Sequence, residues 1–154
     1  MGAGRPRIRN KKARRDYHIE ETVQAGLVLK GSEVKALRQG KCNIDEAFAR
    51  VEEGEVWLYN MHIGPYSQAG WGGHDPRRKR KCLLKRREID RVLGRAVEQG
   101  RTIVPLAVYF KRGWAKVDLA LATGKREFDK REDLKRREHK RQIDRELGRR
   151  YGRK

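Results

Sequence analysis

The chain has 154 residues, enough for one domain with tails, and it carries 40 Lys and Arg against 21 Asp and Glu, a net charge of +19. No apolar run approaches the ~20 residues that span a bilayer, and the charged start of the chain has no apolar stretch behind it, so neither a membrane span nor a secretory signal is expected. The two cysteines, Cys42 and Cys82, lie forty residues apart in neither a metal-binding nor a redox spacing, which predicts reduced thiols in a cytoplasmic protein.

The positive charge is concentrated at the two ends of the chain. Residues 1–15 hold seven basic side chains and no acidic one, and residues 125–154 hold fourteen basic against seven acidic. The longer middle segment, 16–124, has a net charge of only +5. A globular middle with two cationic arms is typical of a protein that binds a polyanion, because each Lys or Arg laid on a phosphate releases a condensed counterion. We therefore expect a mobile basic arm, a folded domain and a basic tail, with nothing in the arm to bury.

The first predicted elements are a strand and a short helix. Apolar and polar residues alternate over 17–23, as in a half-buried strand. Residues 25–26 are expected to break this strand, and 27–29 would then form either a second short strand or a bent continuation of the first. A helix is predicted from residue 31 to Gly40, with Ser32 accepting from the free amide hydrogens of its first turn.

A hairpin and a longer helix follow. Residues 47–52 and 56–63 read as two strands, and the second is apolar or aromatic on both faces, which suggests a covered position. Glycine and proline make 64–81 an irregular segment. Residues 84–99 carry one apolar stripe at helical spacing, ended by Gly100.

A second hairpin, 102–110 with 114–122, completes the predicted domain. About six short strands are too few for a large sandwich, so we predict a mainly β protein: a small closed antiparallel oligonucleotide-binding (OB-fold) barrel with flanking helices. From Lys125 onward apolar residues nearly vanish, and the good helix formers there predict a helix that folds on a partner.

The segment before the long helix is the strongest binding signal. From Arg77 to Arg87, eight of eleven residues are basic, and the run leads into an amphipathic helix that would hold it on a rigid scaffold. This predicts a phosphate-binding edge that includes Arg80 and Lys81. Tyr66, Trp71 and His74 precede the run and could stack on splayed bases, although Trp71 could equally cover one end of the core.

Catalysis has little support. His74 and Asp75, with His62, could be read as a metal-dependent nuclease site, but Asp75 before Pro76 is more typical of an Asx turn. There is no phosphate-binding glycine loop and no carboxylate pair placed for metal-assisted cleavage. The sequence therefore predicts a binding protein that is not an enzyme and that needs neither metal nor cofactor.

Several segments, in order along residues 10 to about 141, resemble the SsrA-binding proteins, also called small protein B (SmpB). They are residues 10–17 (NKKARRDY), 19–21 (IEE), 25–27 (AGL), 31–41 (GSEVKALRQGK), 75–76 (DP), 80–81 (RK), 87–90 (REID), 104–106 (VPL), 124–125 (GK) and 129–131 (DKR). The resemblance implies an OB-fold barrel in a bacterial ribosome-rescue protein. Such proteins bind the tRNA-like domain of transfer-messenger RNA (tmRNA), favour its alanylation, and enter stalled ribosomes with it.

The implied partners are tmRNA and the ribosome, with elongation factor Tu and alanyl-tRNA synthetase engaged indirectly through the RNA. The barrel would stand in for the missing anticodon arm near the decoding centre, and the tail would become a helix in the empty messenger channel. The protein would act as a cytoplasmic monomer. A general single-strand or ribosomal-RNA-binding barrel without a rescue role is the alternative.

The resemblance also implies site residues. Those facing RNA are Asn10, Arg14, Gln24, Leu83, Lys116 and Gly124. The ribosome-facing tail segment is Phe128, Asp129, Lys130 and Arg131. Four positions depart from the commoner family pattern: Gln24 stands where an acidic residue is frequent, Cys82 where Leu is usual, Arg15 where His is often found, and Phe128 at a variable site.

Overall fold

The structure is a computed structural model, and it describes residues 7–66, 73–97, 100–125 and 127–151. By its internal contacts the chain separates into two units, residues 1–124 and residues 125–154. The strands are β1 (Ile8–Arg9), β2 (Tyr17–Leu27), β3 (Cys42–Asn43), β4 (Phe48–Glu52), β5 (Glu55–Tyr59), β6 (His62–Ile63), β7 (Arg80–Leu83), β8 (Thr102–Lys111) and β9 (Trp114–Gly124). The helices are α1 (Ala13–Asp16), α2 (Gly31–Arg38), α3 (Arg86–Val97) and α4 (Glu127–Tyr151).

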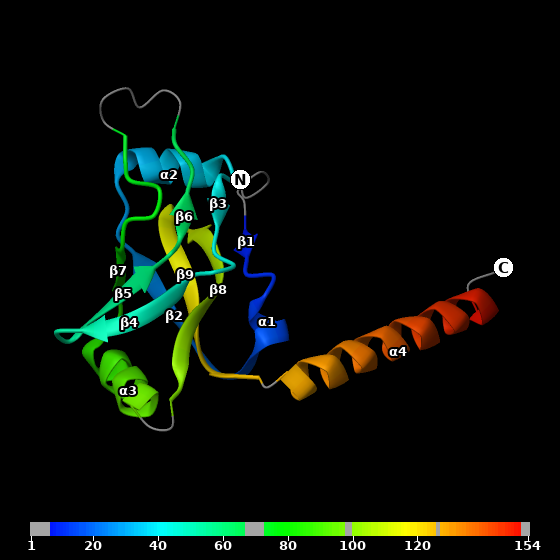
Figure 1. Ribbon diagram of the computed structural model, residues 1–154. Coiled ribbons are helices and arrows are strands. Elements are labelled where there is room, and N and C mark those ends of the chain that lie inside the picture. The colour runs from blue at the N-terminus through cyan, green and yellow to red at the C-terminus, as the bar shows by residue number, and fades with distance from the viewer. Residues whose placement is uncertain (1–6, 67–72, 98–99, 126, 152–154) are drawn as a thin grey trace. The chain divides into compact units, whose positions relative to one another are not determined.

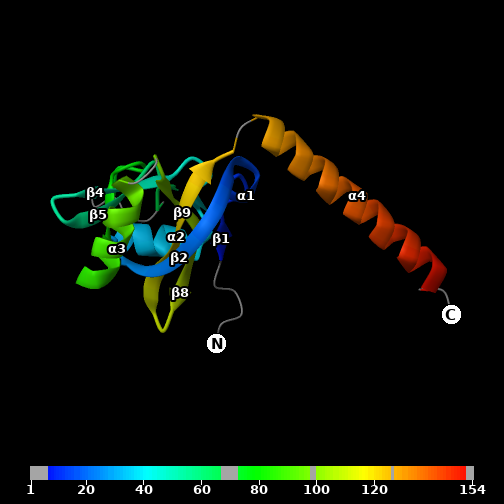
Figure 2. The ribbon, with the colours of Figure 1, turned by 90° about the horizontal axis from the view of Figure 1, so that it is seen from below.

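The first unit is mainly β, with one large antiparallel sheet and flanking helices. The strand order is β1-β8-β4-β5-β7-β2-β9, and β9 pairs again with β8, so the pairings of six strands return to their starting point. Strands β3 and β6 form a separate two-stranded sheet. In Figure 1, α2 lies at one end of the large sheet and α3 at the other. Figure 2 shows the long strand β2 running beside β9, with which it pairs along most of its length.

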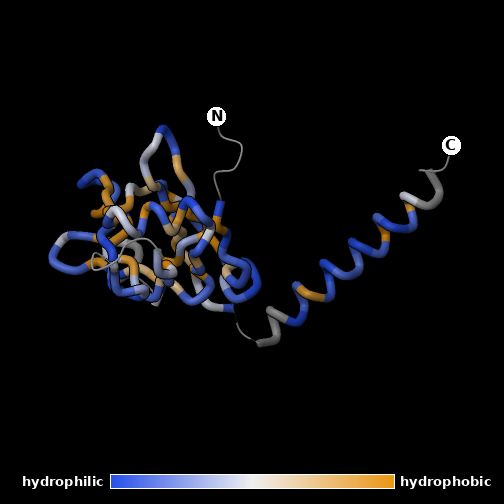
Figure 3. The backbone as a smooth tube through the Cα atoms, turned by 90° about the horizontal axis from the view of Figure 1, so that it is seen from above, coloured by the Kyte–Doolittle hydropathy of each residue, from blue (hydrophilic) through white to orange (hydrophobic). Residues whose placement is uncertain are grey.

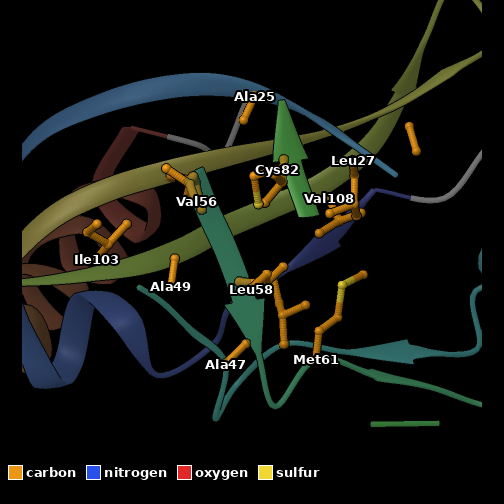
Figure 4. Close-up of a cluster of buried hydrophobic side chains, with 14 of the residues drawn as sticks. Ala25, Leu27, Ala47, Ala49, Val56, Leu58, Met61, Cys82, Ile103 and Val108 are labelled. Carbon is orange, nitrogen blue, oxygen red and sulfur yellow. The ribbon is translucent and has the colours of Figure 1, made fainter. Parts of the chain in front are cut away.

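The main hydrophobic core lies on the inner side of this sheet. Val56, Leu58, Val108 and Val117 are completely buried there, because alternate residues of each strand point inward. Figure 4 shows several of these side chains converging from different strands. A second, smaller cluster of Ala13, Val104, Ala120 and Ala122 lies on the other side of β8 and β9.

The β8–β9 hairpin is confirmed, with its turn at Arg112 and Gly113. Both residues have positive φ, 52° and 81°, as a two-residue turn between twisted strands requires. The inward direction of Val117, Leu119 and Leu121 follows directly from this register.

The predicted break in the first strand is wrong. Strand β2 continues through Ala25 and Gly26, and its irregularity falls between Ile19 and Glu21, where the register against β9 shifts. Gly26 eases a close approach of two strands, since a Cβ at this position would lie 3.3 Å from the Cβ of Leu83 on β7, a tighter contact than most. The glycine therefore allows two strands to pack together where the sequence suggested an interruption.

The predicted strand over 56–63 is instead two strands. Strand β5 ends at Tyr59, Asn60 takes a positive φ of 59°, and β6 turns away to pair with β3. Both β5 and β6 are partly buried, so apolar and aromatic residues run through both of them, and this continuous pattern predicts a single strand.

The segment predicted to be irregular, 64–81, ends in a strand, because β7 begins at Arg80. Strand β7 pairs with β5 on one side and with β2 on the other, so it is central in the sheet. Its inward residues are Arg80 and Cys82. The sequence pattern concealed this strand because one of its two core positions is an arginine.

The predicted first turn of the helix at residue 31 needs correction. The residue before α2 is Lys30, and its backbone N–H donates to Glu33 Oε1 at 2.8 Å. Ser32 is buried, and its hydroxyl pairs with His74 Nδ1 at 2.8 Å instead of capping the helix.

The expectation that residues 1–15 have nothing to bury is wrong for the described part of that arm. Ile8 packs against the main core from β1, and Ala13 on α1 is 2% exposed in the second cluster. The backbone pairing of Ile8 and Arg9 with β8, together with these two side chains, attaches this part of the arm to the sheet.

The second unit is the helix α4. Its apolar side chains Leu134, Ile143 and Leu147 are all exposed, and no side chain of residues 131–148 is buried. Figure 3 shows the helix as hydrophilic along most of its length. Lys125 pairs with Asp133 and Arg145 with Glu138 within this unit.

Candidate nucleic-acid interface

Asn10 holds the N-terminal segment in place. Its side-chain amide donates to the carbonyl oxygens of Ile44 at 3.1 Å and Pro105 at 2.9 Å, and its Oδ1 accepts from the backbone N–H groups of Lys12 and Ala13, both at 3.0 Å. Since all of these bonds lie within the protein, we interpret Asn10 as a residue that positions the following turn. Its predicted direct contact with RNA is left untested by this geometry.

The next turn displays Arg14 beside a cationic hollow. The hollow has a volume of about 520 Å³. It is lined by Arg7, Arg9, Asn10, Lys11, Arg14, Thr22, Leu106, Ala107 and Asp118. Four positive side chains around one opening, against a single carboxylate, make it a suitable receptor for phosphate groups.

Gln24 belongs to a polar network that the sequence analysis missed. It lies opposite Asp118 across β2 and β9, and its amide donates to Tyr109 Oη at 2.5 Å. Tyr109 Oη in turn donates to Asp118 Oδ1 at 2.7 Å, and Arg7 pairs with the other oxygen of Asp118 at 3.5 Å. The Arg7 guanidinium also lies 4.5 Å from the centre of the Tyr109 ring. Burial and the hydrogen bond to Asp118 raise the pKa of Tyr109, so the phenol stays protonated and able to donate.

Leu83 and Lys116 lie in one row across four neighbouring strands. Gly26 on β2 is opposite Leu83 of β7 on one side and Lys116 of β9 on the other, and Lys116 is opposite Tyr109 of β8. Leu83 is 52% exposed although it is apolar. This row and the adjacent Gln24–Asp118 pair form one outward surface, which we call the β2–β9 face.

Lys81 also points outward from β7, where it pairs with Glu55 Oε2 at 2.9 Å. The Lys81 side chain is 36% exposed, so the lysine can exchange this carboxylate for a phosphate. Its prediction as an RNA-facing residue therefore stands as a proposal.

Arg80 cannot serve as a surface phosphate ligand. Its side chain is 0% exposed, and it pairs with the equally buried Glu33 Oε2 at 2.5 Å. The guanidinium donates further to the backbone oxygens of Met61, Arg78 and Pro76 at 2.5, 3.1 and 3.2 Å. The prediction of Arg80 as an RNA-binding residue is wrong. Its guanidinium is fully occupied by contacts within the protein, which link α2 and the loop before β7 to the sheet.

Glu33 is the acceptor for this buried network. Burial alone would disfavour its charged form, but hydrogen bonds from Arg78, the Lys30 backbone and Arg80 outweigh that effect and hold the pKa of Glu33 below its ordinary value. Arg78 completes the group, with its Nε 3.1 Å from Glu33 Oε1. In the sequence Glu33 is one acidic residue of a short predicted helix. Its role as the acceptor for two arginines becomes visible only in the folded structure, where Arg78 and Arg80 lie next to it.

The loop histidine and aspartate have structural roles. Asp75 Oδ1 accepts from the Arg77 backbone N–H at 3.0 Å, which confirms the predicted Asx turn. His74 lies between the Ser32 hydroxyl and the Ile63 carbonyl oxygen, 3.0 Å from its Nε2. Over the described residues, no group of three His, Cys, Asp or Glu side chains could hold a metal ion. Trp71, which was proposed to stack on bases or cover the core, lies outside the described residues.

Both cysteines are free thiols. Burial raises the pKa of Cys42 to about 12, with a small opposing effect of the Arg80 charge, and raises that of Cys82 to about 12 as well. At neutral pH both thiols are therefore protonated and weakly nucleophilic.

The predicted ribosome-facing residues lie at the start of α4. The side chains of Phe128, Asp129 and Lys130 fall outside the described part of the structure, and Arg131 is exposed.

None of the helices within the described ranges combines the length and the apolar character needed to cross a membrane.

Gly124, at the end of β9, offers a direct test of the β2–β9 side of the molecule. A Cβ added there would meet no atom within 4 Å. We expect Gly124→Ala to change the free energy of unfolding by less than about 0.5 kcal/mol. If RNA approaches this backbone closely, the same methyl group should weaken binding roughly tenfold, about 1.4 kcal/mol. Urea unfolding and RNA titration measure the two effects, and Gly31→Ala, at another open and exposed glycine, is the matched control. Equal affinity of both variants would remove Gly124 from the contact surface.

An antiparallel sheet with a cationic outer surface, joined to a highly charged helix, defines a protein of the nucleic-acid-binding class. The family model described as "SmpB protein" matches residues 7–149. The chain therefore belongs to the SmpB family.

Individual relatives agree. The SsrA-binding protein of Geobacillus thermodenitrificans (strain NG80-2) is 56% identical over 144 residues, covering 94% of this chain and 93% of the relative. That of Acidothermus cellulolyticus is 56% identical over 141 residues, covering 92% and 89%. A solved chain described as "tmRNA-SmpB: a journey to the center of the bacterial ribosome" is 49% identical and superposes with a TM-score of 0.68, covering 84% of this chain and 94% of the solved one.

Proposed function

We propose that this chain is an RNA-binding protein of trans-translation, which binds the tRNA-like domain of tmRNA and brings it to stalled ribosomes. Membership of the SmpB family and the ribosomal setting of the solved relative support this function. The single observation on this chain that carries it is the β2–β9 face, where Lys116, Leu83 and Gln24 point outward from three adjacent strands. The cationic hollow beside Arg14 extends the same surface.

The body of the protein is best understood as a closed OB-fold barrel. The ring of antiparallel pairings from β8 through β4, β5, β7, β2 and β9 supports this architecture, because such closure leaves no exposed edge between these strands. We propose that the barrel acts without enzymatic activity, as a cytoplasmic monomer. Elongation factor Tu and alanyl-tRNA synthetase then meet it through the shared RNA.

The tail is proposed to act on the ribosome. Residues 125–154 carry twice as many basic as acidic side chains, and the apolar residues of α4 have no core to join. A helix of this composition fits a channel lined by ribosomal RNA, where Phe128, Asp129, Lys130 and Arg131 would report that no message is present.

Lys116 provides a quantitative test of the RNA-binding face. Lys116→Ala should weaken binding to the tRNA-like domain and lower the slope of log affinity against log salt by roughly one unit, because one phosphate contact is lost. Lys41→Ala, at an exposed lysine between α2 and β3, is the matched control and should leave the slope unchanged. An unaltered slope in Lys116→Ala would remove this residue from the phosphate contacts.

Competition binding separates the proposed function from a general single-strand or ribosomal-RNA-binding role. A tRNA-like fold should displace a labelled tRNA-like domain at a much lower concentration than a linear strand of equal charge. Equal competition by the two RNAs would favour the general role.

An RNA-cleavage assay with and without divalent metal should show no turnover, and metal-dependent cleavage would revive the nuclease alternative at His62, His74 and Asp75.

A further inference from the structure

The outer side of β4 and β5 carries three aromatic rings. Phe48, Trp57 and Tyr59 are half-buried on the side of the sheet that faces away from the core, whereas the alternate residues Val56 and Leu58 are completely buried. Aromatic pairs on the outer side of a sheet stabilise the pairing of the strands, and partly exposed rings there also offer flat apolar surfaces to a ligand.

Positive groups lie directly over these rings. Phe48 and Tyr59 are opposite each other and stack, with ring centres 5.5 Å apart and planes inclined by 10°. The exposed Arg50 guanidinium lies 5.1 Å from the centre of the Phe48 ring and 5.6 Å from that of the Tyr59 ring, so it sits beside both rings of the stack. Lys79 Nζ lies 4.5 Å from the centre of the Trp57 ring. Aromatic rings and guanidinium planes are the groups on which unpaired bases stack, and this surface carries both.

The acidic residues of the same surface are neutralised. Glu52 pairs with Lys79 at 3.5 Å and accepts a hydrogen bond from Tyr59 Oη. Glu55 pairs with Lys81 at 2.9 Å. Three cations, Arg50, Lys79 and Lys81, stand against the two carboxylates Glu52 and Glu55 on the outer side of these strands, while Glu53 lies in the exposed turn between β4 and β5. The two cations that lie over the rings, Arg50 and Lys79, are the groups that would meet the phosphates of a polyanionic partner.

A hollow of about 570 Å³ adjoins the ring stack on the side of β4 that faces β8 and α3. Phe48 and Leu93 give it apolar walls, and Leu93 is 38% exposed there. Arg50 and Arg101 supply positive charge, and Arg101 also pairs with Glu20 at 2.9 Å. Glu52, which pairs with Lys79, also lines the hollow. The hollow is large enough for one nucleotide, with an apolar wall for a base and Arg50 for its phosphate. Figure 1 shows β4, β5 and α3 gathered at this end of the sheet.

We propose that this surface, which we call the β4–β5 face (Phe48, Arg50, Trp57, Tyr59 and Lys79), is a second RNA-binding site that holds unpaired bases by stacking. It goes beyond the proposed function, because it lies on strands other than those of the β2–β9 face and needs no tRNA-like fold. The two surfaces are connected through β7, whose outward Lys81 lies opposite Trp57. An RNA bound at the β2–β9 face can therefore continue onto the β4–β5 face through a single-stranded segment.

Tryptophan fluorescence of the full chain reports directly on this site. The chain has three tryptophans, so Trp71→Phe with Trp114→Phe leaves Trp57 as the only one. An oligonucleotide of ten uridines should quench its emission at saturation, and an oligonucleotide with 4-thiouridine should cross-link to peptides from residues 48–59. Quenching together with these cross-links supports the proposal, because both signals report contact of the oligonucleotide with residues 48–59.

Two substitutions in this single-tryptophan protein separate stacking from bulk charge. Arg50→Glu should weaken the binding that quenches Trp57 about tenfold or more, because it removes the guanidinium beside the two rings and places a negative charge in its position. Lys111→Glu makes the same charge change at the distant β8–β9 turn and should alter that binding less than about threefold. Thermal unfolding of each variant establishes that it is folded at the assay temperature. A second, milder variant, Arg50→Gln, should give an intermediate loss if Arg50→Glu unfolds the protein.

Three results would overturn the proposal. The first is unchanged Trp57 emission at saturating oligonucleotide. The second is an equal loss of affinity in Arg50→Glu and Lys111→Glu. The third is a Trp57 response to RNA-free ribosomal proteins without one to the oligonucleotide, which would identify a protein-docking face. If affinity for the tRNA-like domain is lost in Lys116→Ala but not in Arg50→Glu, the two sites are separate, and failure of one leaves the other standing.

Discussion

Replacing Glu33 with Gln should destabilise the protein by about 3–5 kcal/mol at neutral pH, the largest effect of any single change considered. The side chains of Glu33 and Arg80 are both 0% exposed, and Arg78 also pairs with this carboxylate. Without the negative charge, the buried Arg80 guanidinium has only carbonyl oxygens as partners, and these cannot compensate its desolvation. Urea unfolding followed by circular dichroism measures the loss.

The pH dependence of this difference gives an independent check. The pKa of Glu33 lies below its ordinary value of 4.5, so the stabilisation is fully present above pH 4.5 and is lost as the pH falls through the lower pKa of the folded protein. The gap between wild type and Glu33→Gln should therefore shrink in acid. Glu52→Gln removes a carboxylate from the more exposed pair with Lys79 and should cost far less. A Glu33→Gln variant as stable as wild type would show that the carbonyl oxygens alone satisfy Arg80.

Truncation after Gly124 should separate RNA binding from ribosome rescue. Residues 1–124 form one unit by their internal contacts and contain every described residue of the β2–β9 face. Charges of the tail that lie beyond the ~8 Å screening length at physiological salt contribute little to binding at that face. Affinity for the tRNA-like domain should therefore change less than about threefold, whereas peptide tagging on stalled ribosomes should be abolished. Filter binding and a tagging assay with purified ribosomes measure the two outcomes.

A scrambled tail is the matched control for charge. Residues 125–154 in shuffled order keep the same net charge but lose the Asp129-Lys130-Arg131 segment and the spacing along α4, a helix roughly 37 Å long. This variant should bind RNA normally and still fail in tagging. Tagging by the scrambled chain would mean that the ribosome recognises only the charge of the tail. Loss of RNA binding in the truncated chain would contradict the assignment of RNA binding to residues 1–124 and of ribosome rescue to the tail.

The strands with ordinary patterns could be predicted from the sequence, and those with charged or small residues inside them could not. The β8–β9 hairpin was predictable because its β-branched strands flank Arg112 and Gly113. Strand β7 was missed because Arg80 occupies a core position, and a basic run is normally solvated. Gly26 suggested a break in β2 because its use, the close approach of Leu83, depends on a neighbouring strand.

The site divides in the same way. The family motifs indicated Gln24, Lys116 and Leu83, but the partners Tyr109 and Asp118 depend on the register between β2, β9 and β8. A shift of one residue in that register would turn Asp118 inward, and no local pattern determines the register.

The sequence by itself determined the division of charge between body and ends, the mainly β character, and the family with its RNA partner, since these depend on composition and on motifs in fixed order. Only the tertiary structure decided which cations are available to RNA. Within one basic run, Arg80 is enclosed with Glu33 while Lys81 faces outward, because successive residues of a strand point to opposite sides of the sheet. The same alternation places Arg50, Trp57 and Lys79 on one outer surface, so a charge becomes a binding group or a core ion pair according to the side of the sheet on which it falls.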